Sequence, residues 1–168
     1  LQLSVPGRFN AANAVAAALA AHCAAGISLA DSGAALGRFG GVRRRQEVRL
    51  SNDRVCLIED FAHHPTAVAE TVAALREAFP GRPLWAVFEP RSNTSRRKVF
   101  QHDYERAFKG AAQVLLMAVT QRSIDSSADL LDVGELAADI TNAGTPAAAL
   151  PTVAAIHQRI VTTAPRGA

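Results

Sequence analysis

The spacing of apolar and polar residues along the chain differs on either side of a glycine pair at residues 40–41. Before it, an alanine-rich run over residues 10–25 predicts a helix, with Asn10 placed to cap its start and Gly26 placed to end it. A shorter helix is predicted over residues 29–38. Because alanine occupies nearly every side of the first helix, we expect that helix to be packed against neighbours rather than exposed. The glycine pair is the best hinge candidate in the chain.

Beyond the hinge, short apolar runs alternate with helical patterns. Two runs on either side of Ser51-Asn52-Asp53 predict a hairpin, and most later apolar runs lead into a helix. Continuous apolar strands are typical of sheets covered on both faces, so the pattern favours an open, mostly parallel α/β sheet with an N-terminal hairpin. The predicted strands cover residues 46–50, 54–59, 84–88, 114–119 and 147–150. The predicted helices cover residues 65–79, 97–109 and 132–142, and a last helix opens at Thr152.

The composition is that of a globular protein and excludes only a few function classes. The 168 residues are 49% hydrophobic and 20% charged, so most of the chain is not disordered. The net charge of +3 is too small to indicate nucleic-acid binding. Two cysteines are too few for a disulfide framework, which favours a reduced, cytoplasmic protein. No signal peptide or membrane span is visible, and the start at Leu1 without a methionine indicates a fragment of a longer protein.

Ligands of open parallel sheets lie beyond the carboxyl ends of the strands, which here means the loops over residues 60–66, 89–96 and 120–127. The first loop holds Asp60, His63 and His64 at the start of a helix. Adjacent histidines beside an aspartate could bind a metal, shuttle a proton or hold a substrate carboxylate. The alternative is that His64 only caps the helix and Asp60 only ends the strand. A metal site is disfavoured because no other His or Cys has ligand spacing.

The second loop is rich in hydrogen-bond donors. Arg91, Arg96 and Arg97 stand beside Ser, Asn and Thr side chains, a set that suits phosphate or carboxylate ligands. The alternative is a solvated polar loop. The isolated triplet Arg43-Arg44-Arg45 after the hinge could reach a phosphate held between two domains. Nucleic-acid binding is the weaker interpretation of this triplet, because no aromatic residues are interleaved with it.

Two further observations concern a nucleotide. Asn10 and Asn13 share one face of a helix start, where two side-chain amides could read a purine edge or merely cap the helix. The chain contains no G-x-x-x-x-G-K-[ST] motif. An ATP-dependent reaction would therefore need parts outside this chain.

In order and spacing these clusters resemble the Mur ligase family. The segment Gly7-Arg8-Phe9-Asn10-Ala11-Ala12-Asn13 resembles the end of the family's central domain, and Gly41-Val42-Arg43-Arg44-Arg45 resembles its domain junction. The strings D-F-A-H-H-P-T from Asp60 and F-E-P-R-S-N-T from Phe88 resemble two loops of its C-terminal domain. The first string points to the branch that uses UDP-N-acetylmuramate. The second points, within that branch, to ligases that attach a recycled tripeptide.

The resemblance implies a three-domain cytoplasmic enzyme. Residues 1–39 would be the C-terminal end of the ATP-binding central domain, and residues 40–168 a Rossmann-like C-terminal domain, truncated at its end. The implied cofactors are ATP and Mg²⁺, bound mainly by the missing part of the central domain. The implied partners are UDP-N-acetylmuramate, the murein tripeptide and the protein's own N-terminal and central domains, with no nucleic acid and no membrane. The chain alone is expected to be inactive.

The resemblance also implies roles for individual residues. Asn10 and Asn13 would approach the adenine, although Phe9 stands where many relatives have His. Arg45 would lie near the nucleotide phosphates, and Asp60 would hold the nucleotide from the C-terminal domain. The residues that would line the peptide cleft are His63, His64, Arg91, Asn93 and Arg96, with Arg122 in a loop where a relative reads a diaminopimelate carboxylate. No catalytic residue and no metal ligand is assigned within this chain.

The implied reaction is amide-bond formation through an acyl phosphate, in peptidoglycan recycling. ATP phosphorylates the muramate carboxylate, and the amine of L-Ala-γ-D-Glu-meso-diaminopimelate then attacks, so basic groups and a closing domain are expected. Two alternatives stay open: a Mur ligase that adds L-alanine, and a non-enzymatic α/β nucleotide-binding module. The hypothesis requires Arg45, Asp60 and Arg91 to gather around one shared crevice at the rim of the sheet.

Overall fold

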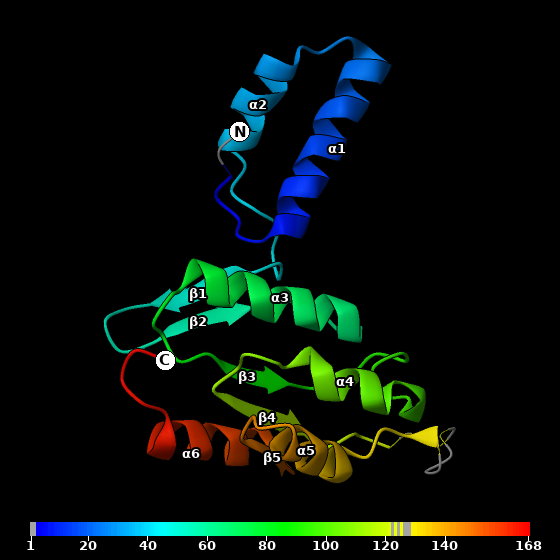
Figure 1. Cartoon of the computed structure of the whole chain (residues 1–168), viewed down its shortest axis with the longest axis vertical. Helices are drawn as coiled ribbons and strands as arrows, with labels where there is room; N and C mark the ends of the chain where they lie inside the picture. The colour runs from blue at the N-terminus through cyan, green and yellow to red at the C-terminus, as the bar shows by residue number, and fades with distance from the viewer. Residues whose placement is uncertain (1–2, 122, 124, 126–128) are drawn as a thin grey trace.

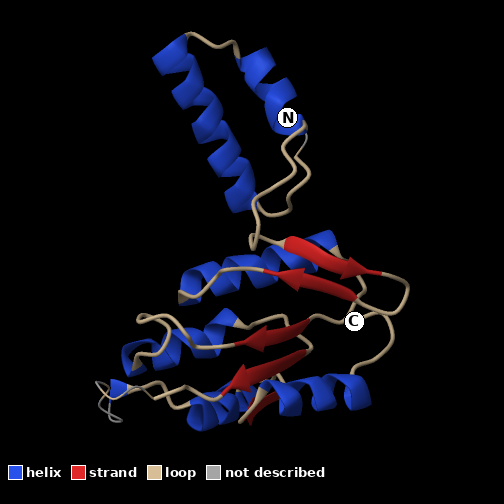
Figure 2. Ribbon diagram, turned by 180° about the vertical axis from the view of Figure 1, so that it is seen from behind, coloured by secondary structure: helices blue, strands red, loops and turns tan. Residues whose placement is uncertain are grey.

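A computed structural model describes residues 3–121, 123, 125 and 129–168 of the chain. Figures 1 and 2 show a helical hairpin that projects from an α/β body. The hairpin consists of α1 (Arg8–Ala25) and α2 (Leu29–Gly37), and a short connection leads from it into the first strand. None of the described helices is long and apolar enough to traverse a lipid bilayer.

The two helices of the hairpin form where the sequence predicts them, but their surroundings differ from the expectation. Gly26 ends α1 in the left-handed conformation, as predicted, and Ser28 caps α2 by accepting the backbone N–H of Asp31. The prediction that α1 is packed on most sides is wrong for the described residues, since Ala14 is its only buried residue. The reason is that α1 packs mainly along α2, while its other sides face away from the body (Figure 1).

The start of α1 depends on a glycine rather than on the predicted asparagine cap. Gly7 occupies the N-cap position with a φ of 103°, a conformation that residues with a side chain rarely adopt. A Cβ atom on Gly7 would lie 2.9 Å from the Cβ of Ala74, so the glycine also permits close approach to the body. The side chain of Asn10 points elsewhere and does not cap the helix.

Among the described residues, the body contains two small sheets and four α-helices. Strands β1 (Glu47–Ser51) and β2 (Cys56–Glu59) form the predicted antiparallel hairpin, and β3 (Trp85–Phe88), β4 (Gln113–Met117) and β5 (Ala147–Leu150) form a parallel sheet in that order. The remaining elements are α3 (Pro65–Ala78), the 3-10 turn η1 (Lys98–Phe100), α4 (Gln101–Ala107), α5 (Val133–Asn142) and α6 (Val153–Thr163). The α/β fold with a parallel sheet is therefore confirmed.

The two sheets are not joined by backbone hydrogen bonds among the described residues. Nearly all Cα–Cα distances between β2 and β3 exceed 8 Å, whereas neighbouring strands of one sheet lie about 4.8 Å apart. A cavity of about 210 Å³ lies between the two strands, lined by residues of both, including Ile58 and Trp85. The chain end lies at the entrance of this gap, where the Ala168 carbonyl accepts the N–H of Cys56 at 3.1 Å.

The core surrounds β4, the central strand of the parallel sheet. Val114, Leu115 and Leu116 are fully buried, because β3 and β5 pair with both edges of β4 and helices pack on its faces. Three aromatic rings pack beside them: the ring centre of Phe88 lies 5.1 Å from that of Tyr104 and 5.6 Å from that of Phe108. The core must be mainly aliphatic because aromatic residues make up only 5% of the chain.

We expect Leu116→Ala to lower the free energy of unfolding by about 2–5 kcal/mol, because it opens a cavity in a fully buried site. Urea unfolding followed by circular dichroism measures this change. Val161→Ala on α6 is the matched control, since Val161 is 66% exposed and its truncation should cost within about 0.5 kcal/mol. Equal losses for the two variants would contradict the placement of the core.

Candidate functional site

Three loops open at one edge of the body. Strands β3 and β4 are parallel, and β2 points in the same direction in both views (Figures 1 and 2). The loops that follow these strands therefore share an edge, as the sequence predicts. The junction between hairpin and body reaches the same edge, because β1 is antiparallel to β2 and Glu47 pairs with Glu59.

The junction folds into a tight turn that contains the arginine triplet. The N–H of Arg45 donates to the carbonyl of Val42 at 3.1 Å, which closes a turn over residues 42–45. Arg44 and Gln46, on either side of Arg45, both have left-handed backbones, with φ values of 59° and 50°. Turn positions with positive φ are normally taken by Gly or Asn, so two longer residues there indicate an imposed conformation.

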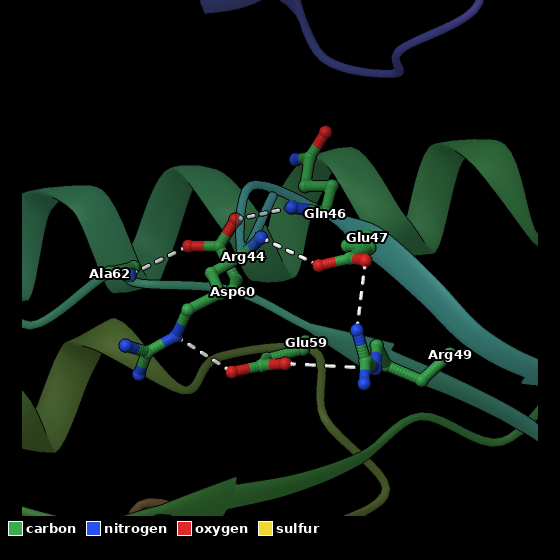
Figure 3. A network of polar contacts seen from close by, with 7 residues as sticks. All are labelled: Arg44, Gln46, Glu47, Arg49, Glu59, Asp60 and Ala62. Carbon is green, nitrogen blue, oxygen red and sulfur yellow. Dashed lines mark hydrogen bonds and ion pairs between the residues drawn. The ribbon is translucent and has the colours of Figure 1, made fainter. Parts of the chain in front are cut away.

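Asp60 holds this junction against the body (Figure 3). One carboxylate oxygen accepts the backbone N–H of Gln46 at 2.9 Å, and the other accepts the N–H of Ala62 at 2.7 Å and the hydroxyl of Thr71 at 3.5 Å. A single half-buried side chain thereby connects the junction, the loop after β2 and helix α3. Its predicted contact with a nucleotide stays a prediction.

Arg45 is exposed and lies over an aromatic ring that sequence reasoning missed. Its guanidinium carbon lies 5.2 Å from the ring centre of Phe61, and that of Arg44 lies at the same distance. The ring of His63 packs edge-on against Phe61, with 5.2 Å between ring centres. Phe61 is 44% exposed, so one face of its ring is open to these side chains. The only signal in the sequence was its position inside the D-F-A-H-H-P-T string.

The two asparagines have different surroundings. The side-chain amide of Asn10 donates to the carbonyl of Pro6 at 2.6 Å and to the Oε1 atom of Gln46 at 3.1 Å. Asn10 thus links the base of the hairpin to the junction. Asn13 is exposed on α1, one turn farther from the junction. The approach of both residues to adenine stays a prediction.

The paired histidines divide into a helix cap and a loop residue. The Nδ1 atom of His64 accepts the N–H of Thr66 at 3.4 Å, and its ring packs edge-on against Phe100. The carbonyl of His63 accepts the hydroxyl of Tyr104, which ties this loop to α4. The capping alternative for His64 is therefore realised. Within the described residues, no group of three or more His, Cys, Asp or Glu side chains could hold a metal ion.

Arg96 is a buried structural residue in this arrangement. Its side chain is 5% exposed, and its Nη2 atom donates to the carbonyl of Thr120 at 2.8 Å and forms an ion pair with Asp125. It therefore braces the loop after β3 against the loop after β4. Arg91 and Asn93 are exposed on the first of these loops. Arg122 lies outside the described residues.

The residues of the predicted crevice border separate cavities. Arg45 borders a cavity of about 640 Å³ between residues 3–6, the junction, β1 and the end of α3. Asp60 borders the gap between β2 and β3, and Arg91 borders a cavity of about 400 Å³ that it shares with Glu89, Pro90, Arg96, Ala118 and Thr120. None of these cavities is bordered by Arg45, Asp60 and Arg91 together, although all three belong to the same edge, and their gathering around one site stays a prediction.

Two side chains of this region have shifted acidities. The backbone N–H of Arg44 lowers the pKa of the Glu47 carboxyl below its ordinary value, with burial opposing the shift and Arg49 adding to it. Burial raises the pKa of the Tyr104 hydroxyl well above its ordinary value, so this group stays protonated and donates to the carbonyl of His63.

Comparison with known proteins shows one family. Residues 43–167 match the family described as Mur ligase, glutamate ligase domain. Over 119 residues the chain is 37% identical to the UDP-N-acetylmuramate–L-alanine ligase of Cytophaga hutchinsonii, covering 71% of this chain and 25% of that protein. Over 121 residues it is 38% identical to the UDP-N-acetylmuramate–L-alanyl-gamma-D-glutamyl-meso-2,6-diaminoheptandioate ligase of Haemophilus influenzae, covering 71% and 26%.

A solved structure matches almost the whole chain. The crystal structure of a murein peptide ligase from Psychrobacter arcticus 273-4 superimposes with a TM-score of 0.68 at 29% identity, covering 99% of this chain and 34% of that one. The chain spans about a quarter of the length of the curated relatives described above.

We expect the Glu47 carboxyl to titrate below the ordinary range of glutamate, because its charged form accepts the Arg44 N–H. Since the folded pKa is lowered, the stabilisation is present above the ordinary pKa and is lost as the pH falls through the lowered value. Carbon-13 NMR of the side-chain carboxyl measures the midpoint.

Arg49→Gln is the informative variant for this titration. Because the backbone bond is the largest cause of the shift, the midpoint should rise in Arg49→Gln and still stay below the ordinary value. An ordinary midpoint in the unaltered chain would contradict the bond between Glu47 and the Arg44 N–H.

Proposed function

The chain belongs to the Mur ligase family, and on that premise we propose that it is the C-terminal part of an ATP-dependent ligase that forms an amide bond on UDP-N-acetylmuramate. The observation that supports this best is the exposed guanidinium of Arg45, held at the junction between two left-handed residues and over the ring of Phe61. A fixed cationic group beside a hinge suits the phosphates of a nucleotide that another domain binds.

The chemistry supplied by ATP and Mg²⁺ is activation of the muramate carboxylate as an acyl phosphate. In this proposal Arg45 binds phosphate oxygens and offsets negative charge that builds up as the phosphoryl group moves. Asp60 fixes the junction that carries Arg45, and Asn10 fixes the base of the hairpin against the same junction. The described residues offer no cluster suited to a metal ion, so we assign Mg²⁺ to none of them.

We propose that the attacking amine comes from a peptide with free carboxylates, L-Ala-γ-D-Glu-meso-diaminopimelate. The string F-E-P-R-S-N-T supports this choice, and its Arg91 and Asn93 side chains are exposed at the loop edge. Arg91 borders a cavity of about 400 Å³, a size that suits a small peptide. Arg96 contributes by bracing this cavity rather than by reaching a ligand freely.

L-Alanine as the amine substrate is the second candidate, because relatives named for each activity are about equally similar to this chain. The relative from Cytophaga hutchinsonii that carries this activity in its name is 37% identical, and the tripeptide-type relative from Haemophilus influenzae is 38% identical. Sequence identity therefore does not distinguish the tripeptide from L-alanine as the amine substrate. Both candidates are ATP-dependent, and we place either enzyme in the cytoplasm, where two unpaired cysteines stay reduced.

The complete ligase that contains this chain should form product from UDP-N-acetylmuramate, ATP and the tripeptide, with kcat/KM at least about tenfold above that for L-alanine. This difference corresponds to about 1.4 kcal/mol in the transition state and reflects the additional carboxylates of the glutamyl and diaminopimelyl residues, which L-alanine lacks. Release of inorganic phosphate with each amine measures it. A preference for L-alanine would assign the enzyme to the second candidate.

Arg45→Ala in the complete ligase should lower kcat/KM for ATP by about 100- to 1,000-fold, because a fixed positive group is lost from the phosphates. Arg45→Lys should recover only part of the activity, since a lysine cannot form the two-pronged contact. Arg159→Ala on the exposed face of α6 is the control and should leave kcat/KM unchanged. Normal activity in Arg45→Ala would exclude the proposed role.

A further inference from the structure

We propose that Glu47 and Glu59 are positioning residues that fix the direction of Arg45 by holding a strained turn. The proposal rests on the proposed function, because Arg45 is the group assigned there to the nucleotide phosphates. Neither glutamate reaches a ligand in this proposal, and both act through Arg44, the neighbour of Arg45.

The turn needs an external restraint because of its backbone. In a turn closed by the Arg45 N–H and the Val42 carbonyl, Arg44 occupies the third position with a φ of 59°. That position favours glycine or asparagine when φ is positive, and an arginine there costs free energy. Such strain persists only where surrounding contacts over-determine the conformation, and it concentrates at functional sites.

Each glutamate holds a different part of Arg44 (Figure 3). The Oε2 atom of Glu47 accepts the backbone N–H of Arg44 at 2.8 Å, and the Oε1 atom of Glu59 accepts its side-chain Nε–H at 2.8 Å. Arg49 joins the two carboxylates, at 2.9 Å from Glu47 and 3.8 Å from Glu59. The backbone and the side chain of Arg44 are therefore both held by anions on the hairpin β1–β2.

The electrostatic attraction within these ion pairs adds too little stability to account for the network. The side chains of Arg44 and Glu59 are 58% and 38% exposed, and ion pairs at such exposure add little stability. A charge-assisted bond from a backbone N–H is more specific, because it fixes a dihedral angle as well as a distance. The geometry thus points to a role in conformation and not in overall stability.

Gln46, the residue that follows Arg45, is held in the same manner as Arg44. Gln46 has a φ of 50°, and its N–H donates to Asp60. Gln46 is 7% exposed, and its side chain accepts a hydrogen bond from Asn10. Arg45 consequently stands between two left-handed residues whose N–H groups both bind carboxylates, and its guanidinium lies over Phe61. Removing the contacts that hold Arg44 or Gln46 should therefore let the Arg45 guanidinium move away from the Phe61 ring.

The position of the Arg45 side chain over the Phe61 ring can be measured in the 168-residue chain without any ligand. Protons of a side chain lying over a phenylalanine face are shifted upfield in NMR spectra, so the δ-methylene protons of Arg45 report its position over Phe61. Glu47→Ala and Glu59→Ala should each remove at least half of this shift. Asp53→Ala is the matched control, because it removes an exposed carboxylate from the same hairpin and should leave the shift intact.

A double variant tests whether Glu47 acts by holding the positive φ angle of Arg44. Glycine adopts a positive φ without strain, so Arg44→Gly added to Glu47→Ala should restore at least half of the lost Arg45 shift. Amide signals of the buried strand β4 serve as the folding check in every variant. If Glu47→Ala fails this check, Glu59→Ala decides the question, because it removes only a side-chain contact of Arg44.

In the complete ligase, Glu47→Ala should lower kcat/KM for ATP on the order of 10- to 100-fold and leave KM for the amine substrate unchanged. An Arg45 shift that persists in both single variants would overturn the proposal, as would a failure of Arg44→Gly to restore it. Loss of the shift in a ligase that Arg45→Ala does not impair would uphold the positioning of Arg45 and refute the function proposed above.

Discussion

The carboxylate of Asp60 is the contact on which the arrangement of this edge depends. It accepts backbone N–H groups from Gln46 and Ala62, two residues that belong to different segments of the chain. An unpaired backbone N–H in a half-buried place is costly, so the carboxylate satisfies two groups that the local strand and helix leave free. Through it the hairpin, the first sheet and helix α3 meet at one point.

The same point connects the two halves of the proposed site. On one side, Gln46 leads through Asn10 to the base of α1. On the other side, the loop after Asp60 carries Phe61 and His63, and the carbonyl of His63 leads through Tyr104 to the core beside β4. Hydrogen bonds and ring contacts thus connect the base of the helical hairpin with the most buried part of the body.

Elements governed by local sequence could be predicted, and long-range relations could not. The helices α3, α5 and α6 begin where His64, Asp132 and Thr152 cap them, because capping involves residues two or three positions apart. In contrast, the left-handed backbone of Arg44 carries no sequence signal, and its side chain bonds to Glu59, fifteen residues away. The burial of Arg96 likewise depends on Asp125 in another loop. The separation of β2 from β3 could not be predicted either, because the pattern of apolar residues along the chain does not say which strands pair.

The open gap between β2 and β3 has a consequence for the behaviour of the isolated 168-residue chain in solution. Among the described strands, each of these two has a hydrogen-bonded neighbour on one side only, and the other side is lined by apolar residues such as Leu57 and Val87, each about half exposed. Unsatisfied strand edges are templates for intermolecular pairing. Ala168 already occupies the first bonding position along β2. In the isolated 168-residue chain this edge can therefore pair with a strand of a second copy, and we expect self-association of that chain to begin there.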